Sequence, residues 1–129
     1  TYTQDFLANF YERFGIPLET DEEIIRHARR LQELGARNVL VSLAARGAIL
    51  LTETSEVYQS LPPDGTVRNS VGAGDSMVAG FLTGYQNTSD YQKALTLGLA
   101  AGSASAFLPW LATRDDVAKL LTNPTEYGI

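Results

Sequence analysis

The most constraining feature of this chain is a glycine turn at the start of a helical pattern, Gly72-Ala73-Gly74-Asp75. Glycine adopts backbone conformations that other residues avoid, and it lets another group approach the main chain closely. Behind the turn, apolar residues recur on one broad helical face, namely Met77, Val78, Phe81, Leu82 and Tyr85. Earlier in the chain, a helical pattern, a short link and the apolar, β-branched run at residues 39–43 follow one another, which favours an α/β fold.

The turn also has a chemical consequence. A helix N-terminus carries unpaired amides and the positive end of the helix dipole, so it binds anions such as phosphate. The amides of Gly72, Ala73 and Gly74 would then form an anion hole. The carboxylate of Asp75 would repel a phosphate, and it is better placed as a general base on an attacking hydroxyl. Alternatively, the turn is a packing device and Asp75 is a first-turn acid that complements the dipole.

Composition narrows the class of protein. The 129 residues suffice for one compact domain, and 44% of them are apolar, as in globular proteins. Cysteine is absent and His27 is the single histidine, which argues against disulfides and against thiolate or histidine metal sites. The net charge of −5, without a basic cluster, argues against nucleic-acid binding. No apolar run is long enough to span a bilayer and no signal peptide is recognisable, so we expect a cytoplasmic protein that binds no membrane.

Start and stop signals divide the chain into helices and strands. A capping box of Thr20 and Glu23 begins a helix that Gly35 ends, and His27 lies off its apolar stripe, which predicts an exposed side chain. A second capping box at residues 89–92 and a cap at Thr113 predict two further helices after the one that follows Asp75. Short strands are predicted over residues 39–43, 48–51 and 57–59, with a turn-rich loop at 61–65.

Two more segments are candidates for ligand contact. The segment from Ser42 to Gly47 follows a predicted strand, and ligands of α/β sheets bind at the carboxyl ends of strands. A turn at Gly47 that only joins two strands explains this segment equally well. The helix through residues 100–106, which includes Ala101 and Ser105, is rich in small residues. Small side chains permit close approach of another helix, which is the default interpretation, or of a flat ligand.

The segment Asn69-Ser70-Val71-Gly72-Ala73-Gly74-Asp75-Ser76 resembles the second signature of the PfkB (ribokinase-like) carbohydrate kinases. Within that family, the sequence of this segment is most similar to that of the 1-phosphofructokinases. The resemblance continues from about Glu22 to Leu121 and covers only the C-terminal part of these kinases, which are more than twice as long. It implies that residues 1–129 form a single domain, the C-terminal nucleotide-binding portion of a ribokinase-like fold, with a mostly parallel sheet flanked by helices. The chain would then be a fragment that is inactive alone.

The resemblance also implies a reaction and roles for residues. ATP, accompanied by Mg²⁺, would phosphorylate a sugar phosphate, with fructose 1-phosphate to fructose 1,6-bisphosphate favoured and a tagatose-6-phosphate kinase as the alternative. Asp75 would be the base, and Gly72, Ala73 and Gly74 the anion hole. The expected nucleotide-binding residues are Ser42, Leu43, Arg46, Gly47, Ala101 and Ser105. A nucleotide-binding module without catalysis is the hypothesis from another class. A homo-oligomer is compatible with the sequence, which does not specify the number of copies.

The chain departs from the family pattern at three places. Ala44 replaces the first glycine of the family's Ser/Thr-Leu-Gly-x-x-Gly turn, which borders the nucleotide. Asn69 stands where many members have Asp, so it either helps to organise the phosphates without a charge or only caps the turn. At the N-terminus, Asn9 and Glu12 have the spacing of Asn and Glu in the family's Lys-Pro-Asn-x-x-Glu motif, but at a shifted position in the alignment. We therefore assign them no metal role.

Overall fold

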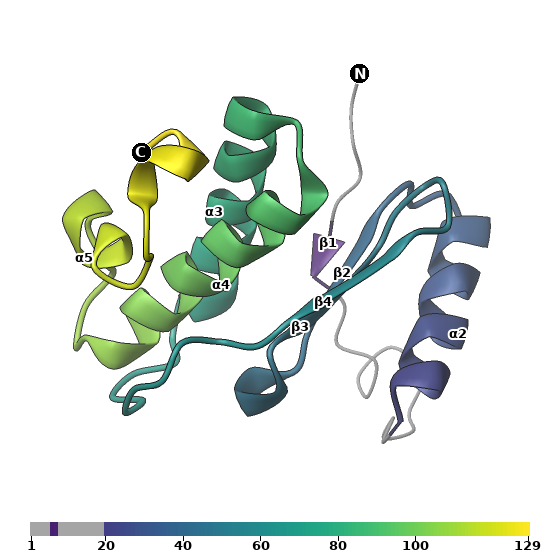
Figure 1. Ribbon diagram of the computed structural model, residues 1–129. Coiled ribbons are helices and arrows are strands. Elements are labelled where there is room, and N and C mark those ends of the chain that lie inside the picture. The colour runs from purple at the N-terminus through teal and green to yellow at the C-terminus, as the bar shows by residue number, and fades with distance from the viewer. Residues whose placement is uncertain (1–5, 8–19) are drawn as a thin grey trace.

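The computed structural model describes residues 6–7 and 20–129 of the chain. A sheet occupies the middle, helix α2 (Asp21–Glu33) covers one face, and helices α3 (Ala73–Thr88) and α4 (Tyr91–Phe107) cover the other (Figure 1). Helix α5 (Arg114–Ala118) and the 3₁₀ turn η2 (Pro124–Tyr127) lie beyond α4, away from the sheet. The predicted α/β class with flanking helices is therefore confirmed.

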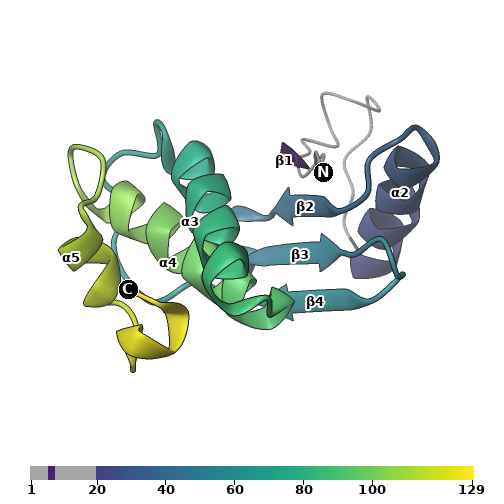
Figure 2. The same ribbon diagram turned by 90° about the horizontal axis from the view of Figure 1, so that it is seen from above.

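The sheet contains the strands β1 (Phe6–Leu7), β2 (Val39–Ser42), β3 (Ala48–Leu51) and β4 (Val57–Ser60), in the order β1-β2-β3-β4. Strand β1 pairs with β2 in parallel, whereas β2, β3 and β4 form an antiparallel meander, whose alternating directions Figure 2 shows. The expectation of a mostly parallel sheet therefore fails for the described strands. Parallel neighbours need a crossover of about a dozen residues, and the connections over residues 43–47 and 52–56 are too short for one.

The side chains of the central strands point alternately to the two faces of the sheet, and they form two separate hydrophobic cores. Successive side chains of a strand point to opposite faces. Val39, Val41 and Ile49 therefore pack against α2 in one cluster. Leu40 and Leu50 point the other way and pack against α3 and α4 in a second cluster. Because both faces are covered, β2 and β3 read as continuous apolar runs rather than as alternating ones.

Helix α2 starts where the sequence predicts, with Thr20 Oγ1 accepting the Glu23 N–H at 3.2 Å. The expectation of an exposed His27 was wrong, since its side chain is only 9% exposed. Its Nδ1 lies 2.8 Å from the carbonyl oxygen of Glu23, one turn earlier. That hydrogen bond gives one ring nitrogen a partner, which helps an imidazole to lie beside the apolar stripe.

Helices α3 and α4 form a tightly packed hairpin. A Cβ added to Gly80 would lie 2.8 Å from the Ala101 Cβ, and one added to Gly98 would lie 2.9 Å from the Met77 carbonyl oxygen. Glycine is thus required for this approach of the two backbones. The predicted cap at Ser89 is off by one residue, because Ser89 ends α3 and Asp90 caps α4 by accepting the Lys93 N–H at 3.0 Å. Among the described residues, no helix is both long and apolar enough to cross a membrane.

Candidate active site

The glycine turn is seen at the N-terminus of α3. Gly72 is the N-cap residue, with a left-handed backbone φ of +82° that favours glycine. The Ala73 N–H donates to the Ser70 carbonyl oxygen at 3.2 Å, which closes the turn. The N–H groups of Gly74 and Asp75 have no acceptor within the described part of the chain. The turn therefore presents two backbone donors at the positive end of a 16-residue helix.

The loop ahead of this turn is held by the end of α4. The carbonyl oxygen of Ala106 accepts the N–H groups of Arg68 and Asn69, at 2.7 and 3.0 Å. The Asn69 Oδ1 accepts the Val71 N–H at 3.0 Å, and its Nδ2 donates to the Pro109 carbonyl oxygen at 3.4 Å. Of the two roles left open for Asn69, the structure gives it the hydrogen bond that caps the turn.

A cavity of about 500 Å³ opens beside the turn. It lies between the end of β2, the loop after β4, the start of α3 and the last turns of α4. This volume falls within the range of small-molecule sites, and the position at the end of strands is where α/β proteins bind ligands. The cavity is lined by Ser42, Ala45, Gly47, Leu61, Pro62, Pro63, Asp64, Gly65, Val67, Ser70, Ala73, Gly74, Met77, Leu99, Gly102, Ser103, Ala106 and Phe107.

Of the predicted nucleotide loop, only part borders this cavity. Ser42 and Gly47 line it. Leu43 is half-buried against the core under α2, and its N–H closes the turn on the Gly47 carbonyl oxygen at 2.8 Å. The Arg46 guanidinium forms an ion pair with Asp21, the two atoms being 2.8 Å apart, at the start of α2. Neither Leu43 nor Arg46 lines the cavity, so their role in binding stays a prediction.

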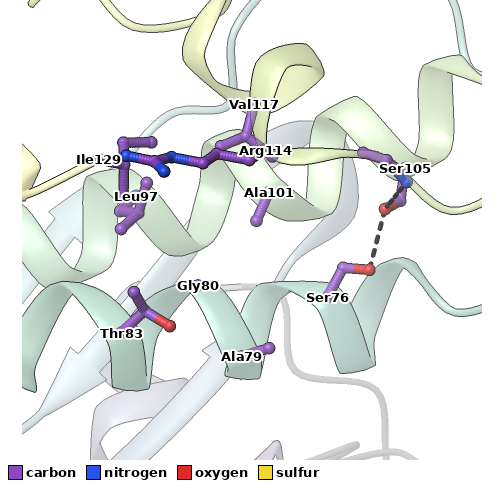
Figure 3. Close-up of a pocket in the computed structure, with 11 residues that line it drawn as sticks. Ser76, Ala79, Gly80, Thr83, Leu97, Ala101, Ser105, Arg114, Val117 and Ile129 are labelled. Atoms are coloured by element: carbon purple, nitrogen blue, oxygen red, sulfur yellow. Dashed lines mark hydrogen bonds between the residues drawn. The ribbon is translucent and has the colours of Figure 1, made fainter. Parts of the chain in front are cut away.

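The helix residues chosen from the sequence lie on another face of α4. Ala101 and Ser105 line a second cavity of about 240 Å³ between α3, α4 and α5 (Figure 3). The residues of α4 that border the larger cavity are Leu99, Gly102, Ser103, Ala106 and Phe107, at a spacing of three and four. Sequence spacing shows that residues 101 and 105 share a face, but it does not show which face meets the ligand.

The loop after β4 also belongs to the site, although its sequence does not indicate contact with a ligand. Residues 61–65 were recognised as a turn-rich loop, and the structure makes them one wall of the larger cavity. Gly65 lies against the ring of Phe107, since a Cβ added there would come within 2.4 Å of two ring carbons. The Pro-Pro-Asp-Gly sequence indicated a turn, but it contained no sign of what the loop faces.

Asp75 lies next to the cavity rather than in its lining. It follows the lining residue Gly74, belongs to the first turn of α3 and is exposed. A group bound at the Gly74 and Asp75 amides would therefore lie beside its carboxylate. Within residues 6–7 and 20–129, no cluster of three or more acidic, histidine or cysteine side chains forms a metal site. Asn9 and Glu12 lie outside the described residues.

Known proteins resemble this chain in sequence and in fold. The model of the pfkB family of carbohydrate kinases matches residues 8–109. The chain belongs to this family. It is 44% identical to the 1-phosphofructokinase of Bacillus subtilis over 110 residues, which cover 85% of this chain and 36% of that protein. It is 39% identical over 124 residues to an ATP-dependent 6-phosphofructokinase isozyme 2 of Mycobacterium tuberculosis, covering 91% of this chain and 36% of that protein.

Solved structures agree with the sequence relatives. Ribokinase of Arabidopsis thaliana, complexed with ribose and ATP, superimposes with a TM-score of 0.77 at 27% identity, over 88% of this chain and 38% of that chain. Phosphofructokinase-2 of Escherichia coli, in complex with substrates and products, gives 0.74 at 27% identity, over 86% of this chain and 36% of that chain. The ribokinase-like α/β fold of a pfkB sugar kinase is thus confirmed, for a chain that spans little more than a third of these relatives.

Proposed function

We propose that residues 1–129 are a single domain, the C-terminal nucleotide-binding portion of a kinase that uses ATP to convert fructose 1-phosphate into fructose 1,6-bisphosphate. The observation that carries this proposal is that three features lie next to one another at the start of α3. A cavity of about 500 Å³ ends at the N-terminus of α3, two unpaired amides point out of that terminus, and the exposed carboxylate of Asp75 follows them.

The amides supply the electrostatic part of the reaction. In phosphoryl transfer, negative charge is spread over the equatorial oxygens of the moving group, and preorganised donors stabilise that charge. The N–H groups of Gly74 and Asp75 are such donors, because the helix leaves them without internal partners. The Ala73 N–H already donates within the turn, so we expect it to contribute less.

Asp75 supplies the proton acceptor. As the sugar hydroxyl oxygen forms its bond to the γ-phosphorus of ATP, the bond from that phosphorus to the bridging oxygen breaks and ADP leaves. The hydroxyl proton passes to the carboxylate of Asp75, which is exposed and therefore open to a sugar. A carboxylate at this place would weaken phosphate binding, so a role in the chemical step explains its position better than a role in affinity.

The residues that line the larger cavity fit ATP. The cavity has the volume of a nucleotide-sized site and its lining is mostly apolar apart from Asp64 and three serines, which suits a flat base. The described part of the chain has no cage of acidic ligands, and Mg²⁺ in such sites is held mainly by the substrate phosphates and water. The ion would arrive with ATP, and it would supply positive charge that offsets the negative charge of the phosphates.

The proposed substrate comes from the named relatives, and a panel of sugars tests it. The full-length kinase that contains this segment would be assayed with ATP and Mg²⁺ on fructose 1-phosphate, tagatose 6-phosphate and fructose 6-phosphate. We expect the highest kcat/KM on fructose 1-phosphate. A higher value on either of the other sugars would replace the proposed substrate, and ATP binding without turnover on any of them would favour a non-catalytic module.

The role of Asp75 is tested in the same enzyme. We expect Asp75→Asn to lower kcat by about 100- to 10,000-fold, as for loss of a general base, while the Kd of ATP stays within about twofold. The matched control is Asp115→Asn, which removes an exposed carboxylate from the first turn of α5, a helix that does not border the larger cavity. A variant Asp75→Asn that keeps half of its turnover would exclude the base role.

A further inference from the structure

Ser105 is the most thoroughly enclosed polar residue near the reaction centre. Its side chain is 3% exposed and lies on the last turn of α4. Its Oγ lies 2.9 Å from the Oγ of Ser76, on the first turn of α3, as the dashed line in Figure 3 shows. The same oxygen accepts the N–H of Ala112 at 3.1 Å, from the segment that leads to α5. One hydroxyl therefore joins three parts of the fold.

The first turn of α3 has few other side-chain anchors. Two of its opening residues, Gly72 and Gly74, have no side chain, and that of Ala73 is a methyl group. Within residues 72–76, Ser76 is the only one whose side chain makes a hydrogen bond in the described part of the chain. Glycine leaves the backbone free to move unless its neighbours are fixed. The bond from Ser76 to Ser105 is therefore well placed to fix this turn.

Contacts on either side make the end of α4 a platform for the turn. A Cβ added to Gly102 would lie 3.1 Å from the Ala73 carbonyl oxygen, so the two helices touch at the turn itself. One turn further along α4, the Ala106 carbonyl oxygen holds the N–H groups of Arg68 and Asn69. Ser105 lies between these two contacts and adds the only hydrogen bond between side chains that the described residues provide there.

We infer that Ser105 is a positioning residue for the phosphoryl transfer and not a nucleotide contact. Its hydroxyl acts through Ser76 on the adjacent Asp75 and on the amides of the turn. It does not line the larger cavity, so its loss disturbs the reacting geometry more than the affinity for ATP. Misplacing a reacting group by about 1 Å can lower a rate by about 100-fold. The inference rests on the proposed kinase function.

A double-mutant cycle in the full-length kinase tests the inference. The variants are Ser105→Ala, Ser76→Ala and the double variant, assayed on whichever sugar phosphate the unaltered enzyme uses best. We expect each single variant to lower kcat by about 10- to 100-fold with the KM of ATP within about twofold. The double variant should lose no more than either single one, because both remove the same bond.

The matched control is Thr96→Ala. Thr96 lies on the same helix, is half-buried and donates from Oγ1 to the Gln92 carbonyl oxygen at 3.0 Å, so its loss also removes one hydroxyl bond from α4. We expect its kcat to match that of the unaltered enzyme. Equal losses for Thr96→Ala and Ser105→Ala would show general softening of α4 and would overturn the inference. A kcat within about twofold of normal for Ser76→Ala would overturn it as well, even if Ser105→Ala fails to fold.

Hydrogen exchange supplies a readout that needs no activity. Ser105→Ala should speed exchange of the amides in residues 72–78, while those in the first half of α4 stay protected. Unchanged exchange at the turn would overturn the inference. If the unaltered enzyme phosphorylates none of the sugars, the proposed function fails, and faster exchange confined to the turn would still support the positioning role of the bond.

Discussion

The substitution Gly47→Ala tests whether the loop at the carboxyl end of β2 is as tightly built as the structure shows. Gly47 has a φ of +87°, and a left-handed conformation costs a residue with a Cβ about 1–2 kcal/mol. The added Cβ would lie 1.9 Å from the carbonyl oxygen of Ser60 and 2.9 Å from the Leu61 Cα, both backbone atoms. Because neither atom can turn aside, β4 must shift, and overpacking of this kind costs about 1–3 kcal/mol more.

The substitution Gly72→Ala separates the cost of the left-handed backbone from the cost of overpacking. Gly72 has a similar φ of +82°, but its added Cβ would meet only the Leu111 Cδ2, at 2.8 Å. The Leu111 side chain is 61% exposed and can rotate away. We therefore expect Gly72→Ala to cost about 1–2 kcal/mol, from the backbone alone, and Gly47→Ala about 2–5 kcal/mol.

Urea unfolding of the full-length kinase and of both variants measures the difference. We expect the midpoint for Gly47→Ala to lie below that for Gly72→Ala, and Gly47→Ala also to weaken ATP binding, because Gly47 lines the larger cavity. Gly72→Asn serves as a control, since asparagine tolerates the left-handed region better than alanine does. If Gly47→Ala is no less stable than Gly72→Ala, the contact with Ser60 does not limit this position and the reasoning fails.

Three more predictions follow from the same structure. Gly74→Val should weaken ATP binding and lower kcat, because a branched side chain would block approach to the amides of α3; unchanged values in both would show that the turn is only structural. The 129-residue chain, which covers 36% of its Bacillus relative, should show no turnover alone; a rate near 10 per second from a monomer would refute this. Hydrogen bonds from the backbone and side chain of Thr113 lower the pKa of Asp116 in the folded state. These bonds therefore stabilise the fold fully above the unfolded pKa of about 3.9. Their contribution disappears as the pH falls through the lower pKa of the folded state. The gap in urea midpoint between the unaltered chain and Asp116→Asn should therefore narrow below about pH 4, and a gap that is equal at pH 6 and pH 3 would contradict this.

Local signals predicted helices α2 to α5 and strands β2 to β4, whereas strand β1 and the turn η2 were not predicted. Thr20 and Thr113 cap helices as predicted, and the second forms the full reciprocal capping box with Asp116. The apolar runs at residues 39–43 and 48–51 became the two central strands, because runs of that length without alternation fit strands covered on both faces. These features depend on neighbours within a few residues, so a single sequence contains the information.

Features that depend on distant partners were harder to predict. The small residues of α4 indicated close packing, but the choice between the face of Ala101 and the face of Gly102 depends on where α3 and the sheet lie. His27 was misjudged because a hydrogen bond to the carbonyl oxygen of Glu23 offsets the burial of its ring. The antiparallel meander was predictable from loop lengths, and the family resemblance outweighed that local evidence.

The arrangement of neighbouring elements has a kinetic consequence. Strands β2, β3 and β4 are joined by short turns, and α3 and α4 are joined through Ser89 and Asp90, so most contacts of these units are between residues close in sequence. Low contact order favours fast folding. The pairing of β1 with β2 joins residues more than thirty positions apart and must close a long loop first. The meander and the helical hairpin should therefore form early, and the parallel strand should be added to an edge that already exists.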